Sequence, residues 1–316
     1  MKLLVTRNLP DRVISALDGQ FDCDFREGAT PLDETAARDA LQTYDAILPT
    51  LGDQLGAGAF PEAPRCGLLA NFGVGVNHID VAAATAAGVA VTNTPGAVTD
   101  ATADVAMMLM LMAARRASEG EAMVRAGRWT GWQPTQLLGL HLTGKTVGII
   151  GMGRIGQAIA KRAHHGFGMR VLYHNRSPKG PLGFDATQLD LDAVLAQSDV
   201  VVMAVPATAQ TRHLIGASEL EKMQPHAIFV NIARGDVVDE QALIDALEAQ
   251  KIAGAGLDVY EFEPTVPEAL RALKSVTLLP HLGTAALEVR EAMGMMAVDN
   301  LIAFAQGKPL PNPVRI

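Results

Sequence analysis

The stretch KTVGIIGMGRIGQAIAKR, residues 145–162, decides how this chain folds. An apolar strand pattern runs directly into Gly151, Gly153 and Gly156, and an amphipathic helix pattern follows. In this setting the first glycine permits a tight turn, the second lets the backbone approach a pyrophosphate, and the third lets the helix pack on the strand. The helix should begin at Arg154, where free N–H groups and a partial positive charge favour phosphates. The stretch predicts a dinucleotide-binding strand–turn–helix unit, and the alternative is a glycine-rich turn without a ligand.

Short apolar runs alternate with helical patterns along the rest of the chain. Strands are predicted at 2–6, 44–50, 66–72, 88–96, 146–150, 169–173, 199–204, 227–231, 253–257 and 276–279. Helices are predicted at 11–17, 32–41, from Thr99 or Asp100 to about 116, and at 154–165, 189–196, 217–223, 239–249 and roughly 285–305. Strands that alternate with helices predict an α/β fold with parallel sheets, and the second series reads as doubly wound.

The composition excludes several classes of protein. The 316 residues suffice for two domains, and the net charge of −8 argues against a nucleic-acid binder. The longest apolar run, VAMMLMLMAA at 105–114, is too short to span a bilayer and indicates a buried helix. Two cysteines without a CxxC spacing favour a reducing compartment. We therefore expect a cytoplasmic protein with no membrane partner and no bound metal.

The segment VLYHNRSPKG, residues 171–180, indicates which dinucleotide is bound. It lies where the strand after the glycine-rich helix should end, and there an NAD site commonly has an acid that binds the ribose diol. This chain has Asn175, Arg176 and Ser177 instead. An arginine suits a 2′-phosphate, which an acid would repel. The segment predicts a preference for NADP(H), with NAD(H) possible, and the alternative is an ordinary solvated turn.

Three further strand ends carry polar residues that a binding fold alone does not need. They are Arg234 in VNIARGDVVDE (230–240), Asp258, Glu261 and Glu263 in AGLDVYEFEP (255–264), and His281 in LLPHLGTAA (278–286). In an open α/β sheet, ligands bind at the carboxyl ends of the strands. We therefore expect an arginine, an acid and a histidine on the edge that carries the dinucleotide.

These residue types suit hydride transfer to a carbonyl. An arginine can polarise the ketone oxygen and pair with a carboxylate, and a histidine can donate the proton that the new alkoxide needs. A carboxylate behind the histidine would orient it and favour its protonated form. Each residue alone could equally be structural, so the argument rests on all three lying at successive strand ends.

The sequence resembles the D-isomer-specific 2-hydroxyacid dehydrogenases over nearly its full length. The similarity is carried by GKTVGIIGMGRIGQAIAKR, VNIARGDVVDEQAL, GAGLDVYEFEP and PHLGTA. Within that family, NFGVGVNHID, VTNTPGAVTDATADVAMMLMLMAARR and HNRS are most similar to the glyoxylate and hydroxypyruvate reductases. The resemblance implies an NADPH-dependent reductase of small 2-keto acids that yields D-2-hydroxy acids.

The resemblance also implies roles for individual residues. Arg234 would bind the substrate carboxylate and carbonyl, Glu263 would be the partner acid, and His281 the proton donor. Substrate contacts would come from the backbone of Val74 and Gly75 and from Leu51 and Asn71. The implied cofactor contacts are Gly151, Gly153, Arg154, Ile155, Gly156, Asn175, Arg176, Ser177, Val205, Pro206, Ile232 and Asp258, of which Asp258 would contact the nicotinamide amide.

The family further implies an architecture. Both domains would be doubly wound parallel-sheet domains. A discontinuous flavodoxin-like substrate domain, residues 1–97 and 287–316, would be interrupted by an inserted Rossmann cofactor domain, residues 98–286, and the cleft would close by hinge motion. Members are usually homodimers that pair through the cofactor domain and the long helix near 100–125. The segment 127–139, with Trp129 and Trp132, would then belong to the dimer contact or to the rim of the neighbouring cleft. A plain core role for both tryptophans is the alternative.

Two other functions remain open at this stage. A dinucleotide-sensing corepressor of similar fold could keep the arginine, acid and histidine, although the chain has no long polar or basic extension. A dehydrogenase of the same fold could act on larger 2-keto acids, or on formate or phosphite, with a different pocket.

Overall fold

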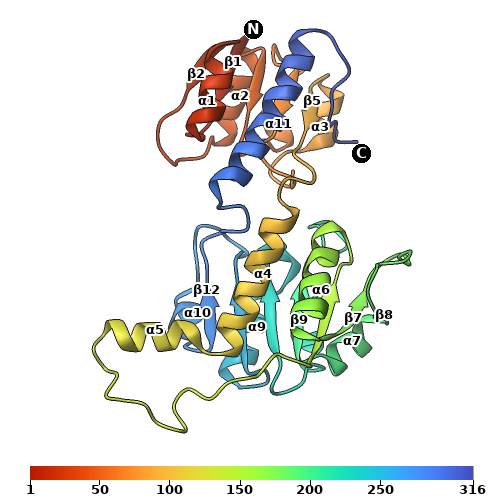
Figure 1. Ribbon diagram of the computed structural model, residues 1–316. Coiled ribbons are helices and arrows are strands. Elements are labelled where there is room, and N and C mark those ends of the chain that lie inside the picture. The colour runs from red at the N-terminus through yellow and green to blue at the C-terminus, as the bar shows by residue number, and fades with distance from the viewer. Residues whose placement is uncertain (316) are drawn as a thin grey trace. The chain divides into compact units, whose positions relative to one another are not determined.

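The computed structural model describes residues 1–315, and the chain divides into two compact units. The first unit contains Met1–Val98 and the chain from Ala285 onward, and the second contains Thr99–Thr284. Each unit is built on one parallel β-sheet covered by helices (Figure 1). The fold is therefore α/β, as the alternating pattern predicts.

The first unit has a five-stranded sheet in the order β2-β1-β3-β4-β5. Its strands are β1 (Lys2–Val5), β2 (Asp22–Phe25), β3 (Ala46–Leu48), β4 (Leu68–Ala70) and β5 (Ala90–Thr92). Its helices are α1 (Asp11–Asp18), α2 (Glu34–Thr43), α3 (Val81–Ala86) and α11 (Leu287–Ala305), with a short 3-10 turn η1 (Ala57–Ala59). Apolar residues of α2 and α3 pack on one face of the sheet, and those of α1 and α11 pack on the other.

The second unit has a seven-stranded sheet in the order β12-β11-β10-β9-β6-β7-β8. Its strands are β6 (Thr146–Ile150), β7 (Arg170–His174), β8 (Ala186–Gln188), β9 (Val200–Met203), β10 (Ile228–Asn231), β11 (Gly254–Leu257) and β12 (Val276–Leu278). Its helices are α4 (Thr99–Ala114), α5 (Ala117–Arg125), α6 (Arg154–Phe167), α7 (Leu191–Gln197), α8 (Ala217–Leu220), α9 (Glu240–Glu248) and α10 (Glu268–Ala272), with the 3-10 turn η2 (Gly235–Val237).

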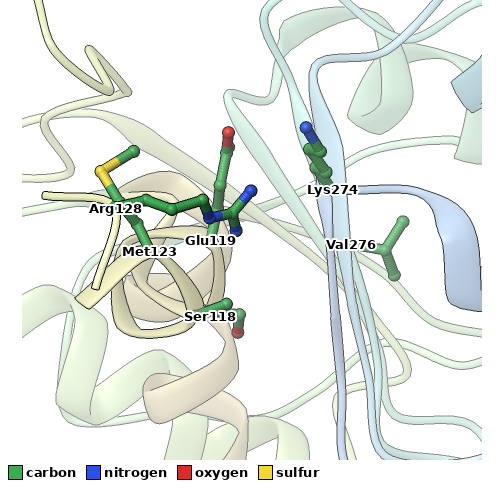
Figure 2. Close-up of a pocket in the computed structure, with 7 residues that line it drawn as sticks. Ser118, Glu119, Met123, Arg128, Lys274 and Val276 are labelled. Atoms are coloured by element: carbon green, nitrogen blue, oxygen red, sulfur yellow. The ribbon is translucent and has the colours of Figure 1, made fainter. Parts of the chain in front are cut away.

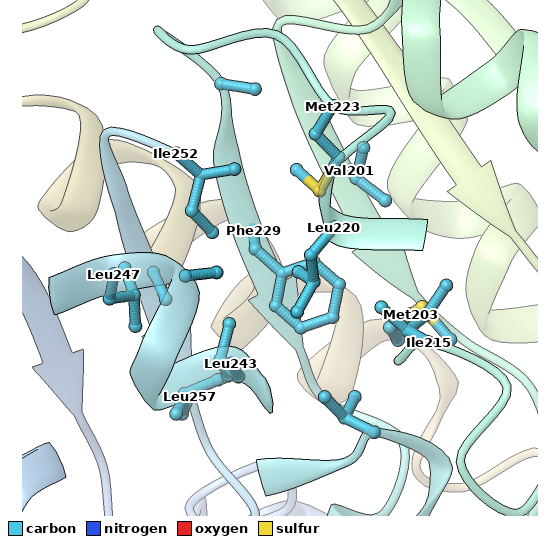
Figure 3. Close-up of a cluster of buried hydrophobic side chains, with 14 of the residues drawn as sticks. Val201, Met203, Ile215, Leu220, Met223, Phe229, Leu243, Leu247, Ile252 and Leu257 are labelled. Carbon is cyan, nitrogen blue, oxygen red and sulfur yellow. The ribbon is translucent and has the colours of Figure 1, made fainter. Parts of the chain in front are cut away.

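Two apolar layers hold this sheet between its helices. Phe229 of β10 is fully buried in the layer formed with α7, α8 and α9 (Figure 3). Its neighbours Ile228 and Val230 point to the other face, where they pack with α4 and α6. Because side chains alternate along a strand, a strand that is buried on both faces is mostly apolar, as β9 is throughout and β10 is up to its last residue, Asn231.

The structure confirms the predicted elements and corrects some of their ends. The long helix predicted to about residue 116 ends at Ala114, because Arg116 takes a left-handed backbone conformation (φ 52°) and caps a separate helix α5. The pattern missed β2 and β8, two edge strands with partly exposed and polar residues, and the short helices α3, α5 and α10. Within residues 1–315, no helix has the length and apolar character needed to cross a bilayer.

The junction between β6 and α6 depends on close backbone contact. Gly151 has a φ of 102°, a conformation that side chains rarely adopt. A Cβ atom at Gly156 would lie 2.1 Å from the carbonyl oxygen of Gly151, so the first turn of the helix rests directly on the backbone of the turn. This contact fixes where α6 begins relative to the sheet.

We expect Gly156→Ala to lower the free energy of unfolding by about 1–3 kcal/mol, the usual cost of overpacking. Gly166→Ala on the same helix is the matched control, because a Cβ there meets nothing within 4 Å. That control should gain about 0.5–1 kcal/mol, since alanine is the better helix former. Denaturant unfolding measures both variants, and equal effects would contradict the contact.

Candidate active site

The glycine-rich turn leaves the start of α6 open for an anion. Gly153 is the N-cap, no side chain caps the helix, and the first turn holds no acid. A Cβ at Gly153 would meet nothing within 4 Å, so the space beside the turn is free. Arg154 is exposed and Ile155 half-buried at the first helical positions. An uncapped helix N-terminus with free space fits the pyrophosphate of a dinucleotide.

The turn after β7 uses its asparagine to hold the glycine-rich turn. Asn175 Oδ1 accepts a hydrogen bond from the Met152 N–H at 3.0 Å, and Asn175 Nδ2 donates to the Ser177 carbonyl at 2.7 Å. Arg176 and Ser177 are exposed, and no ion pair holds Arg176 within residues 1–315. The sequence led us to expect Asn175 only as a cofactor contact, whereas its side chain also organises both turns.

Arg234 lies in the loop after β10, and the buried residues Asn231 and Gly235 determine the shape of this loop. Asn231 Nδ2 donates to the Arg234 carbonyl at 2.9 Å, and Asn231 Oδ1 accepts from the Ala233 N–H at 3.0 Å. A Cβ at Gly235 would lie 1.9 Å from the Tyr260 carbonyl carbon, so this loop touches the one after β11 backbone to backbone. Sequence reasoning missed Asn231, although a polar residue at the end of an apolar strand is a usable signal.

The Arg234 side chain is a buried cation with unused donors. Its Nη1 donates to the Ala233 carbonyl at 2.7 Å, while its Nε is buried without a hydrogen-bond partner. Burial lowers the pKa of Arg234, and the charges of Glu263 and Asp236 act in the opposite direction. A buried guanidinium with an unsatisfied N–H is well suited to a carboxylate or a carbonyl oxygen.

His281 and Glu263 meet at the edge of the sheet. The imidazole Nδ1 of His281 lies 2.8 Å from Glu263 Oε2, and Glu263 Oε1 accepts from the Tyr260 N–H at 3.0 Å. Burial alone would raise the pKa of Glu263, but the hydrogen bond and charge of His281, the Tyr260 N–H and the charge of Arg234 outweigh it, so that pKa lies below its usual range. Glu263 is therefore ionised at neutral pH and favours the protonated imidazole.

Asp258 holds the backbone that carries His281. It is buried, its Oδ1 accepts from the Leu282 N–H at 2.6 Å and its Oδ2 from the Gly283 N–H at 2.8 Å. Burial raises the pKa of Asp258, and these two hydrogen bonds oppose the rise. His281 takes a left-handed conformation (φ 54°), and its own N–H donates to the Asp258 carbonyl. The expected contact of Asp258 with a nicotinamide amide stays a prediction.

The other expected cofactor residues of this unit follow two neighbouring strands. Val205 and Pro206 come after β9, where Val205 is half-buried and Pro206 exposed. Ile232 is buried after β10 and packs in the layer with α4 and α6. Together with the glycine-rich turn, these residues lie at carboxyl ends of β6, β9 and β10, where a parallel sheet binds its ligands.

The expected substrate residues lie at the carboxyl edge of the five-stranded sheet. Asn71 is buried after β4, and its Nδ2 donates to the carbonyls of Gly73 and Gly75, both at 3.0 Å. Its Oδ1 is buried without a partner. Val74 is exposed at the tip of this loop, and the Asn93 Nδ2 donates to its carbonyl at 2.9 Å. Asn71 therefore shapes the loop from within.

Leu51 lies on a second loop of that edge, which is organised by a residue that sequence reasoning missed. Leu51 is 42% exposed, and the fully buried Asp53 closes the turn beneath it. The Asp53 carboxylate accepts from the Thr50 N–H at 2.9 Å and pairs with Arg7 Nη1 at 3.0 Å. An aspartate three residues after a threonine is common in loops, so the sequence offered no clear signal for this role.

Comparison with known proteins gives the family. The profile of the D-isomer specific 2-hydroxyacid dehydrogenase NAD-binding domain matches residues 107–283. The chain is 42% identical to the glyoxylate reductase of Thermococcus litoralis, covering 99% of this chain and 96% of that one. It is 44% identical to the glyoxylate reductase of Pyrococcus furiosus, covering 99% and 95%. The chain belongs to the D-isomer-specific 2-hydroxyacid dehydrogenases.

Solved structures agree with this membership of the 2-hydroxyacid dehydrogenases. A Thermus thermophilus protein superposes with a TM-score of 0.93 at 41% identity, over 100% of both chains. The NADPH-dependent glyoxylate/hydroxypyruvate reductase of Sinorhizobium meliloti, in complex with NADP and malonate, superposes with a TM-score of 0.87 at 38% identity, over 99% of this chain and 96% of that one. The protein is thus an oxidoreductase of this family with a nicotinamide dinucleotide cofactor.

Two cavities of the second unit are lined by other residues. One, of about 330 Å³, opens between α5 and β12 (Figure 2) and is lined by Ser118, Glu119, Ala122, Met123, Arg128, Lys274 and Val276. The other, of about 600 Å³, lies on α4 and α6 and is mostly apolar. Within residues 1–315, no cluster of three or more His, Cys, Asp or Glu side chains could hold a metal ion.

We expect His281→Ala to lower kcat for keto-acid reduction by about 10²–10⁴, the usual size of general acid catalysis. Arg234→Ala should in addition raise KM, because Arg234 is expected to bind the substrate carboxylate as well. Steady-state kinetics measure both variants, with thermal unfolding as the check that each is folded. A folded His281→Ala protein with near-normal kcat would contradict the assignment of the proton donor.

Glu263→Gln should change the pH dependence of reduction. A neutral amide no longer favours the protonated imidazole, so the pH above which kcat/KM falls should move down, while activity at acid pH survives in part. A pH–rate profile of the variant against the wild type measures this shift. An unchanged alkaline limb would mean that Glu263 does not assist His281.

Proposed function

We propose that the protein uses NADPH to reduce glyoxylate to glycolate, and hydroxypyruvate and similar small 2-keto acids to D-2-hydroxy acids. The observation that carries this proposal is the pairing of His281 with an ionised Glu263, in a unit whose buried Arg234 has an unused donor. The names of the relatives from Pyrococcus furiosus and Sinorhizobium meliloti support the substrate class, and the NADPH dependence of the Sinorhizobium meliloti enzyme supports the cofactor.

In this mechanism each residue has one task. Arg234 binds the carboxylate of the keto acid and polarises its carbonyl oxygen. A nicotinamide bound at the glycine-rich turn would supply the hydride for the carbonyl carbon. Because Glu263 accepts at Nδ1, the proton that His281 gives to the new alkoxide comes from Nε2. Water returns a proton to His281, and Asp258 keeps its backbone in place.

The proposal assigns substrate selection to loops of the first unit. The backbone of Val74 and Gly75 would bind the substrate carboxylate, and Leu51 and Asn71 would limit the size of the substituent. The hydrogen bonds from Asn71 and Asn93 give this loop a defined shape before substrate arrives. Preorganised backbone N–H groups suit a carboxylate.

The test is a panel of 2-keto acids against NADPH and NADH, scored as kcat/KM. The proposal expects glyoxylate or hydroxypyruvate with NADPH to be the best pair. If a larger 2-keto acid is the best substrate, the protein is a dehydrogenase of the same family with a different substrate. Absence of turnover with every keto acid, together with tight NADPH binding, would favour a dinucleotide-sensing role.

The NADPH preference rests on the turn after β7. We expect Arg176→Ala to lower kcat/KM with NADPH. The loss should correspond to about 1–3 kcal/mol of transition-state stabilisation, the size of a charge-assisted hydrogen bond, whereas kcat/KM with NADH should stay nearly unchanged. Arg170→Ala, which removes an exposed arginine from the start of the same strand, is the control. Equal losses with both cofactors would show that Arg176 does not read the phosphate.

We also propose that the protein forms a homodimer through the second unit. Exposed apolar side chains gather on α4, α5 and the segment after them: Met108, Leu111, Val124, Trp129, Trp132 and Leu138. The tryptophans are 55% and 81% exposed, which argues against a core role within one chain. The two cavities on α4, α5 and α6 belong to the same region, and such patches commonly mark protein interfaces.

Leu111→Glu should therefore shift the protein from dimer to monomer in sedimentation or size-exclusion measurements, because a buried charge in an interface is costly. Leu287→Glu is the control, since Leu287 is an exposed leucine on α11 of the other unit. A monomeric wild type, or an unchanged dimer in Leu111→Glu, would contradict this interface.

A cytoplasmic location is part of the same proposal. Cys23 and Cys66 are both free, and burial raises the pKa of the Cys66 thiol to about 12. Cysteines left unpaired suit a reducing compartment.

A further inference from the structure

A second histidine–glutamate pair lies beside the proposed active site. His213 Nε2 is 2.8 Å from Glu261 Oε1, and Arg212 Nη2 approaches the same oxygen at 3.4 Å. The Glu261 side chain is only 9% exposed, whereas those of His213 and Arg212 are 36% and 58% exposed. The carboxylate of Glu261 is thus largely withdrawn from water and depends on these partners.

Glu261 lies on the same short turn as Glu263. The Glu261 N–H donates to Glu240 Oε1 at 3.2 Å, and the Tyr260 N–H donates to Glu263 Oε1 at 3.0 Å. The Thr265 N–H closes the turn on the Phe262 carbonyl at 2.8 Å. The two carboxylates therefore leave one turn toward different partners, Glu261 toward His213 and Glu263 toward His281.

His213 also reaches the loop of Arg234. The backbone N–H of His213 donates to the carbonyl of Asp236 at 2.8 Å, and Asp236 lies two residues after Arg234. The backbone N–H of Ile215 donates to the Val237 carbonyl at 3.2 Å. His213 has a left-handed backbone conformation (φ 48°), which is unfavourable for a residue with a side chain and persists only where contacts hold it. One histidine thus links the two loops that carry Arg234 and Glu263.

We propose that His213 and Glu261 are positioning residues for the reaction. The hydrogen bond between His213 and Glu261 holds in place the turn from which Glu263 contacts His281. Loss of this hydrogen bond lowers the upper limit of the pH range in which the protein reduces its substrate. Arg234, Asp258 and Glu263 are the charged groups around His281, and Arg212, Asp236 and Glu240 are those around the pair. The inference rests on the proposed role of His281 as proton donor.

The experiment compares pH–rate profiles of His213→Leu, His213→Gln and the wild type. His213→Leu should lower kcat/KM about tenfold at about pH 9 and less than about threefold at about pH 6, because a displaced Glu263 no longer favours the protonated His281. His213→Gln should keep most of the activity, since its amide N–H can donate to Glu261. His226→Leu is the control, because His226 forms a similar pair with Asp199 at the amino edge of the sheet.

A uniform loss at all pH values in His213→Leu, or a glutamine variant as damaged as the leucine variant, would overturn the proposal. If His213→Leu does not fold, Glu261→Gln must show the same loss of kcat/KM at alkaline pH only. A loss of kcat/KM in Glu261→Gln that does not depend on pH would also overturn the proposal. Retained turnover in His281→Ala would instead reject the proton-donor role itself. The failure of the positioning pair is thus distinguishable from the failure of the proposed function.

Discussion

The parallel direction of the seven strands is the constraint on which the candidate site depends. Parallel strands place every strand-to-helix loop at the same edge of the sheet. The glycine-rich turn after β6, the Arg234 loop after β10, the Glu263 turn after β11 and the His281 loop after β12 therefore share one edge. Residues far apart in the chain come to one edge because their strands are neighbours, and each loop needs only local hydrogen bonds to aim its side chain.

Those local hydrogen bonds come from polar residues directly behind the site, of which Asn231 and Asp258 are buried and Asn175 is half-buried. Asn231 shapes the Arg234 loop, Asp258 holds the backbone after His281, and Asn175 ties the turn after β7 to the glycine-rich turn. Buried polar groups are costly unless they are satisfied, so each of these side chains fixes one loop conformation. The cation of Arg234 stays under-satisfied in the same region, which leaves it a donor for a ligand.

Sequence patterns predicted the central strands of both sheets because apolar runs buried on two faces are easy to recognise, as in β9 and β10, but they missed the edge strands β2 and β8. They also placed Arg234, Glu263 and His281 at strand ends. The pattern alone offered Asp258, Glu261 and Glu263 as acids, and only the family resemblance named Glu263 as the partner of His281. The roles of Asp53 and His213 were missed because each residue contacts loops that come near it only in the folded chain.

We propose that the residues at this edge of the sheet direct the transfer of a hydride from a bound nicotinamide to the carbonyl carbon of a 2-keto acid. The most direct measurement is reduction of hydroxypyruvate with NADPH in which both hydrogens at C4 of the nicotinamide are replaced by deuterium, followed by NMR and chiral analysis of the product. One deuterium at C2 of D-glycerate is the expected result. A product without the label, or one of L configuration, would contradict it.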